Sequence, residues 1–161
     1  MGTGQTILTL GAMMILSQLV LNVYNGFLSS GAVIQDSKLA VIAVSVATSL
    51  VEEAVGKAFD EATVDDFASS ENMLTRNLGP ESREAYPEFD DFDDYNNLEL
   101  TDTTWTVPYT LRARVVYIDP TNPNGEVLSR TWHKKLTVFV TSPFTADTVS
   151  LQYVFSYWTF R

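Results

Sequence analysis

Cysteine is absent from the 161-residue chain, and basic residues are scarce, with 10 Lys and Arg against 20 Asp and Glu. Without cysteine the chain has no disulfide framework, no thiolate nucleophile and no zinc–thiolate site. The formal net charge is -10, and the longest cationic run is Lys134-Lys135. Because contacts with phosphates need clustered Lys and Arg, we expect no nucleic-acid partner.

Motifs of catalysis are also missing. His133 is the only histidine, and the chain has neither a G-x-S-x-G motif nor a phosphate-binding glycine loop. The paired acids Glu52-Glu53 and Asp65-Asp66 are adjacent in sequence, so on a helix their side chains point about 100° apart and form no dyad. The sequence therefore predicts that the protein is not an enzyme and has no cofactor, apart from the calcium ion considered below.

Charge is missing from the first part of the chain, since no charged side chain precedes Asp36. Residues 7–28 form an apolar run close to the roughly 20 residues that cross a bilayer as a helix. The run lacks the Lys/Arg-rich start and the small-residue cleavage pattern of a secretory signal peptide. We therefore expect this segment to remain in the mature protein.

A second apolar stretch, residues 38–51, has small and apolar residues around nearly its whole circumference, so it must be buried by protein or lipid. Together the two stretches predict one helix from Thr3 to about Ala62, on the order of 90 Å long. The sequence does not decide whether the helix is interrupted near Gly31, because glycine and serine lower helix propensity. Two interpretations also remain: a membrane anchor with a stalk, or a helix held first in the membrane and then packed against copies of itself. The apolarity of residues 39–51 favours the second.

The remaining residues predict an acidic loop region (63–100) and an antiparallel sheet (101–161) after the helix (1–62). Aromatic and leucine anchors in residues 63–97 indicate an ordered loop. Alternating apolar residues predict strands at 109–118, about 126–141 and 148–160, joined by short turns as a meander. The fold class is therefore α+β, with the long hydrophobic N-terminal helix packed on a small antiparallel sheet.

This arrangement resembles the type IV pilin and pseudopilin family. Gln5 lies where such pilins usually have glutamate, and the apolar run follows from Ile7. The stretch FDDFDDYNN (residues 89–97) is similar to aspartate-rich stretches of some minor pilins, and residues 134–158 are similar to their closing strands. Gln5 departs from the family because it lacks the charge that pairs with a neighbouring subunit's N-terminal amine.

The resemblance implies a structural subunit of an extracellular filament on a prokaryotic cell surface. The expected partners are copies of the chain in a helical homopolymer, and the inner membrane before assembly. Two alternatives are a minor pilin or pseudopilin of a secretion or uptake machine, and a bitopic membrane protein with a small soluble binding domain. The side chains expected to form the assembly helix are Gln5, Ile7, Leu10, Met14, Leu21, Phe27, Leu39, Val41, Ile42, Val46 and Leu50.

The acidic stretch at residues 89–97 supplies hard oxygen ligands of the kind that Ca²⁺ prefers, although its spacing does not match an EF-hand. The competing interpretation is a solvated acidic turn pinned to the helix or sheet by its aromatic residues. The sequence favours the pinned turn, because convergence of ligands in space cannot be inferred from it. The candidate calcium ligands are Asp90, Asp91, Asp93, Asp94 and Asn96.

Overall fold

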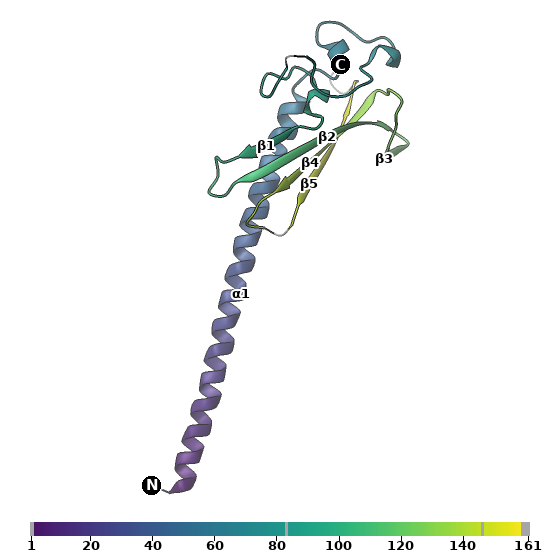
Figure 1. The fold of residues 1–161 in the computed structure, drawn as a ribbon. Helices are drawn as coiled ribbons and strands as arrows, with labels where there is room; N and C mark the ends of the chain where they lie inside the picture. Colours follow the sequence, from purple (N-terminus) through teal and green to yellow (C-terminus); the bar gives the residue numbers. More distant parts are fainter. Residues whose placement is uncertain (1, 83, 146, 159–161) are drawn as a thin grey trace. The chain divides into compact units, whose positions relative to one another are not determined.

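The computed structural model describes residues 2–82, 84–145 and 147–158, and it has the α+β fold expected from the sequence. A 53-residue helix, α1 (Thr3–Val55), contacts a five-stranded antiparallel sheet through its C-terminal part (Figure 1). The chain divides into two compact units, residues 1–39 and residues 40–161. The first unit is helical, and the second holds the end of α1, the acidic loop and the sheet.

Helix α1 is continuous at Gly31, where the sequence left a break open. No proline lies within the helix, and one glycine costs only about 1 kcal/mol relative to alanine. Serine side chains are accommodated inside it, because the hydroxyls of Ser17 and Ser37 donate to carbonyls four residues earlier, each at 2.8 Å. The polar residues of this segment therefore do not interrupt the helix.

The C-terminal end of α1 lies at Val55, so the expectation of a helix to about Ala62 is wrong. Gly56 follows at once and weakens helix propagation. Ala58 then forms a parallel bridge with Asp91: its N–H donates to the Asp90 carbonyl at 3.1 Å, and its carbonyl accepts from Phe92 at 2.9 Å. These bonds to the acidic loop replace the hydrogen bonds that would have continued the helix.

The sheet contains the predicted meander and two short strands besides. Strands β2 (Tyr109–Asp119), β4 (His133–Thr141) and β5 (Val149–Ser156) pair antiparallel in that order. β1 (Glu99–Asp102) and β3 (Asn122–Glu126) both pair with β2 and were not predicted. Residues 127–132 lie outside the strands, although the sequence predicted a strand from about residue 126, and Leu128 is 99% exposed. Phe160, expected in the last strand, lies outside the described residues.

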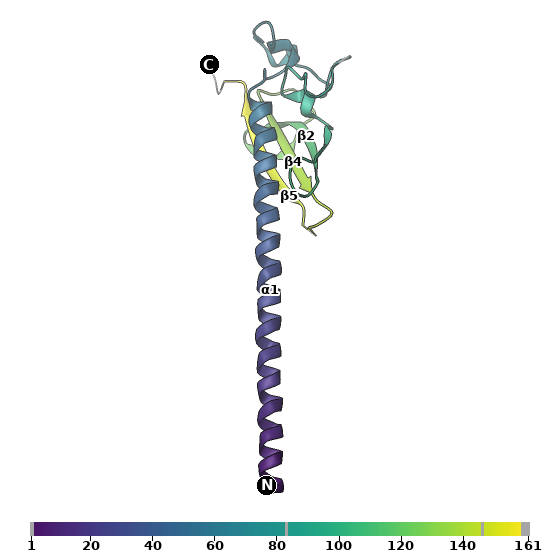
Figure 2. The same ribbon diagram turned by 90° about the vertical axis from the view of Figure 1, so that its left-hand side faces the viewer.

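The core of the second unit forms between one face of the sheet and one stripe of α1. Figure 2 shows the strands on one side of the C-terminal part of α1. On the sheet, alternate residues of β2 face this core, as the sequence predicts, together with Leu136, Val138 and Val140 of β4. The helix contributes Ala43, Val46, Ala47, Leu50, Val51 and Ala54, whose spacing of three and four residues places them on one face.

We expect a fragment of residues 40–161 to fold alone as a soluble monomer. Every buried hydrophobic residue that the structure describes lies between residues 43 and 157, so removing the first unit takes nothing from the core. Circular dichroism and size-exclusion chromatography of the fragment without detergent would check this. An aggregated or unfolded fragment would mean that residues 1–39 are needed for folding.

Candidate functional site

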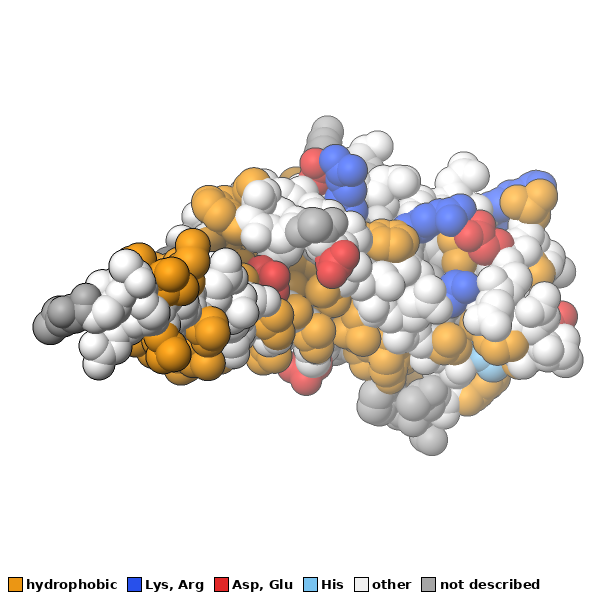
Figure 3. All heavy atoms as spheres, turned by 90° about the horizontal axis from the view of Figure 1, so that it is seen from below, with side chains coloured by type: hydrophobic (Ala, Val, Ile, Leu, Met, Phe, Trp, Pro, Cys, Tyr) orange, Lys and Arg blue, Asp and Glu red, His pale blue; other side chains and the backbone are white. Residues whose placement is uncertain are grey.

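The first unit carries an apolar surface that no other described part of the chain covers. No described residue among 2–39 is buried, and large side chains such as Ile7 and Met14 are 70% and 74% exposed. Hydrophobic side chains gather on this part of the surface in Figure 3. Of the residues expected to form the assembly helix, Gln5, Ile7, Leu10, Met14, Leu21 and Phe27 are all exposed.

This helix is also long and apolar enough to cross a membrane, and its most apolar window has no buried residue. Such a surface in water is unfavourable by about 25 cal/mol for each Å² of apolar area. Covering the exposed apolar residues with lipid or with other protein would therefore be favourable.

The residues expected for assembly in the last part of α1 divide between two environments. Val46 and Leu50 are buried against the sheet of the same chain, so they belong to the core of the second unit. Ile42 is partly buried against that core. Leu39 has intermediate exposure, whereas Val41 is 69% exposed. Val41 is thus the one exposed apolar side chain of this group of five.

The segment that follows α1 is fixed to the sheet by one buried lysine. Lys134 of β4 is 0% exposed, and its Nζ donates to Asp60 Oδ2 at 2.7 Å, to the Phe59 carbonyl at 2.8 Å and to Asp93 Oδ1. Asp60 also accepts from the Thr75 N–H at 2.9 Å. Burial raises the pKa of Asp60, but the charge of Lys134 and these hydrogen bonds outweigh burial and hold the pKa below its usual value. A single cation therefore joins β4, the chain after α1 and the acidic loop.

The stretch FDDFDDYNN is pinned by its aromatic residues, as the sequence predicts. Phe92 packs against Phe155 with ring centroids 5.0 Å apart, and Phe89 packs against Tyr95 at 5.2 Å. The Tyr95 hydroxyl donates to Glu53 of α1 at 2.9 Å. The expectation of a solvated turn is wrong, however, because Asp91 and Asp94 are buried along with the aromatic side chains.

The five predicted calcium ligands divide into two sets. Asp90, Asp91 and Asp94 each offer an oxygen within 4.8 Å of the others. Asp93 is instead paired with Lys134. The Asn96 side chain is used at both ends: its amide donates to the Leu78 carbonyl and its oxygen accepts from the Val115 N–H, each at 3.0 Å. Of the five, Asp90, Asp91 and Asp94 thus form one close group, whereas the side chains of Asp93 and Asn96 bond to other parts of the chain.

Three glutamates that the sequence did not single out lie beside these aspartates. Glu61, Glu81 and Asp91 form one close group, and Glu81, Glu84 and Asp94 form another, each within 4.8 Å. We call the six residues together the acidic cluster: Glu61, Glu81, Glu84, Asp90, Asp91 and Asp94. Burial, followed by the charge of Asp93, raises the pKa of Asp91 to about 9. Burial and a hydrogen bond with Glu84 raise the pKa of Glu81 to about 7. Burial is the largest cause of both shifts, and neighbouring carboxyl groups add to it.

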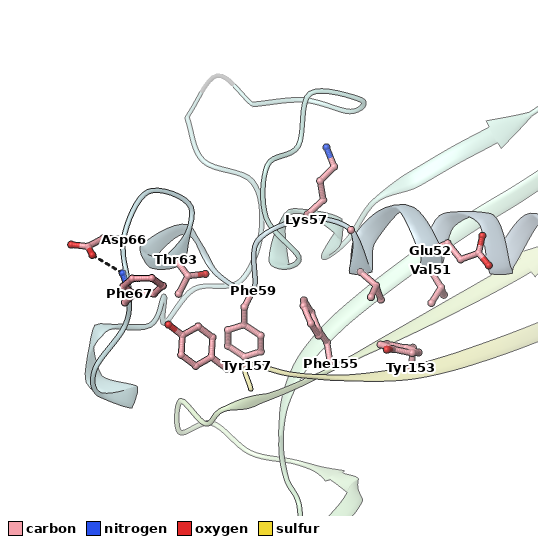
Figure 4. A pocket seen from close by; sticks show the side chains of 12 residues that line it. Val51, Glu52, Lys57, Phe59, Thr63, Asp66, Phe67, Tyr153, Phe155 and Tyr157 are labelled. Atoms are coloured by element: carbon pink, nitrogen blue, oxygen red, sulfur yellow. Dashed lines mark hydrogen bonds between the residues drawn. The ribbon is translucent and has the colours of Figure 1, made fainter. Parts of the chain in front are cut away.

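A cavity of about 680 Å³ opens between the end of α1 and β5. Figure 4 shows Phe59, Phe155 and Tyr157 together on its wall, where Phe59 lies 5.6 Å from Phe155 and 5.5 Å from Tyr157 between ring centroids. Phe67 lies at the exposed rim. Aromatic and valine side chains make up most of the wall, and Glu52, Lys57 and Asp66 also line it.

The comparisons with known proteins give no match to a family model, to a curated protein or to a solved structure. The likeness to pilins therefore rests on architecture: a long apolar N-terminal helix packed, in its C-terminal part, on an antiparallel sheet.

Proposed function

We propose that the chain is a structural subunit of an extracellular, pilus-like helical filament on a prokaryotic cell surface, and that it is not an enzyme. The observation that carries this proposal is the uncovered apolar surface of residues 3–39. The subunit would be held in the inner membrane by this helix before assembly and by copies of itself afterwards. Contacts that repeat from one copy to the next without closing generate such filaments from one chain.

The extent of the apolar surface favours assembly over a permanent anchor. Exposed large apolar residues run from Ile7 to Ile34 without an intervening charge. At 1.5 Å per residue this stretch is about 40 Å long, which exceeds the roughly 30 Å hydrocarbon core of a bilayer. Val41 and Val44 extend the exposed apolar surface beyond Asp36 and Lys38. A membrane would cover part of this surface, whereas a bundle of sister helices would cover all of it.

Burial supplies the free energy of assembly in this proposal. Each exposed leucine or isoleucine that becomes fully buried contributes about 1.5–3 kcal/mol. Specific contacts between small residues such as Gly11, Ala12 and Gly26 would let the helices approach closely. The acidic second units, with the chain's net charge of -10, would keep separate filaments apart in water.

Shearing of intact cells tests the proposal. We expect the sheared fraction to contain fibres by electron microscopy, with this chain as their main protein by mass spectrometry and with no fibres after deletion of its gene. Fibres built mainly from another protein, with traces of this chain, would support a minor pilin instead. Retention of the chain in the membrane until detergent is added would support the bitopic membrane protein.

A further inference from the structure

Three carboxylates lie at the centre of the acidic cluster. Glu81 and Asp91 share one close group, Glu81 and Asp94 share a second, and Asp91 and Asp94 share a third. Glu61, Glu84 and Asp90 lie around these pairs, each in one of the groups. Each pair among the three central residues thus belongs to a group whose oxygens lie within 4.8 Å of one another.

Four buried carboxylate oxygens of the described residues have no hydrogen-bond partner: one on each of these three residues, and Oδ2 of Asp93, whose Oδ1 is bound by Lys134. Asp91 Oδ1 accepts from the N–H groups of Asp93 and Asp94 at 2.7 and 3.2 Å, whereas its Oδ2 has no partner. Asp94 Oδ2 accepts from the N–H groups of Asp90 and Asp91, each at 3.2 Å, whereas its Oδ1 has no partner. Glu81 Oε2 is likewise buried and unpartnered.

In Asp91 and Asp94, backbone N–H groups hold one carboxylate oxygen in place, and the other oxygen remains available as a metal ligand. Asp91 is 0% exposed and Asp94 is 1% exposed, so water does not replace the missing hydrogen bonds from outside. An unsatisfied buried polar atom costs about 1–3 kcal/mol, more for a charged group. Native structures rarely keep several such atoms side by side unless an ion or a bound water holds them.

No ion pair reaches a carboxylate of the acidic cluster in the part of the chain that the structure describes, although the charge of Lys134 acts on Asp91 from beyond ion-pair distance. The ion pairs found there join Arg112 to Glu99, Arg114 to Glu126, and Lys134 to Asp60 and Asp93. Lys57 donates to the Phe89 carbonyl at 2.5 Å. No carboxylate of the acidic cluster takes part in any of these described contacts.

We propose that the acidic cluster binds a calcium ion, with Glu81, Asp91 and Asp94 as its central ligands and Glu61, Glu84 and Asp90 completing its oxygen shell. All the ligand atoms are carboxylate oxygens, which suit a hard cation. Calcium accepts six to eight oxygens in irregular geometry, whereas magnesium demands a near-ideal octahedron and keeps several waters. Six carboxylates from three chain segments fit the coordination of calcium better than that of magnesium.

The ion would lock the joint between α1 and the sheet. Glu61 belongs to the short 3₁₀ turn Glu61–Thr63 just after α1, Glu81 and Glu84 to the middle loop, and Asp91 and Asp94 to the stretch that packs on the core. The backbone of Asp90 and Phe92 already bonds to Ala58 beside them. This inference is independent of the filament proposal, since it needs only the fold of the second unit.

Titration of the metal-free full-length chain in detergent with calcium chloride tests the inference. We expect a dissociation constant of about 0.1–1 mM, in the range of extracellular calcium modules. Saturating calcium should raise Tm by about 5 °C or more, and magnesium chloride should raise it much less. Glu81→Gln should weaken calcium binding by about tenfold or more and leave the metal-free Tm unchanged or higher, because it removes one repelling charge.

Glu88→Gln is the matched control, since Glu88 is an exposed acid of the same loop outside the acidic cluster, and it should bind calcium as the unaltered chain does. Asp91→Asn provides a second variant that keeps an oxygen for the two backbone N–H groups. The proposal is overturned if calcium produces neither a heat of binding in a calorimetric titration nor a change in Tm. It is also overturned if magnesium acts equally well, or if Glu81→Gln and Glu88→Gln behave alike.

Discussion

Replacing Lys134 by alanine is expected to lower the free energy of unfolding of the second unit by about 3–5 kcal/mol, because it leaves two buried carboxylates without their cation. Lys134 is fully buried and pairs with both Asp60 and Asp93. Its Nζ also lies 4.6 Å from the centroid of the Phe59 ring, a cation–π contact that the substitution removes.

Thermal unfolding of the full-length chain in mild detergent, followed by tryptophan fluorescence, measures this effect. We expect Tm to fall by roughly 10–20 °C for Lys134→Ala. Lys135→Ala is the control on the neighbouring residue, because the Lys135 ammonium bonds only to the carbonyls of Pro123 and Asn124 in the described structure, at 3.1 and 3.3 Å. It should lower Tm far less. Equal changes for the two lysines would show that the Asp60–Lys134–Asp93 contacts contribute little.

Replacing Val41 by aspartate is expected to abolish filaments while the chain still folds and still reaches the membrane. Val41 is exposed on α1, outside both the core of the second unit and the apolar run at residues 7–28. In a bundle of sister helices the new carboxylate would be buried without a partner at every subunit, a cost of several kcal/mol for each copy. The same position in a bitopic membrane protein would lie in water, where the substitution would be harmless.

The amount of sheared fibre and the amount of chain in the membrane, measured side by side, decide between these outcomes. Leu128→Asp is the matched control, since it places the same charge at a side chain that is 99% exposed on the second unit. We expect it to leave the fibres intact. Wild-type amounts of fibre from Val41→Asp would exclude this face of α1 from the assembly contacts.

The sequence predicted the elements whose hydrophobic pattern is local. Alternation in β2 identified both the strand and its core-facing residues, and the lack of charge before Asp36 identified the exposed part of α1. β3 was missed because Pro123 and Gly125 are typical of turns, and a short edge strand tolerates them. The end of α1 was missed because it depends on the bonds between Ala58 and the acidic loop.

The sites depended on contacts between distant parts of the chain. Lys134 and Asp60 are 74 residues apart, so nothing in the local pattern distinguished Lys134 from its neighbour Lys135. Asp90, Asp91 and Asp94 were recognised as potential ligands by their residue type alone. Glu61 and Glu81 were not, because only the fold brings them to Asp91. An acid with an unpaired buried oxygen is visible only in three dimensions.

Thiol labelling of intact sheared fibres tests the central claim most directly: that sister copies cover the apolar surface of residues 3–39. The chain has no cysteine, so Val33→Cys and Leu128→Cys each introduce a single reporter. We predict that a water-soluble maleimide labels Leu128→Cys fibres at once, and labels Val33→Cys only after the fibres are dissociated in detergent. Rapid labelling of Val33→Cys in intact fibres would contradict the claim.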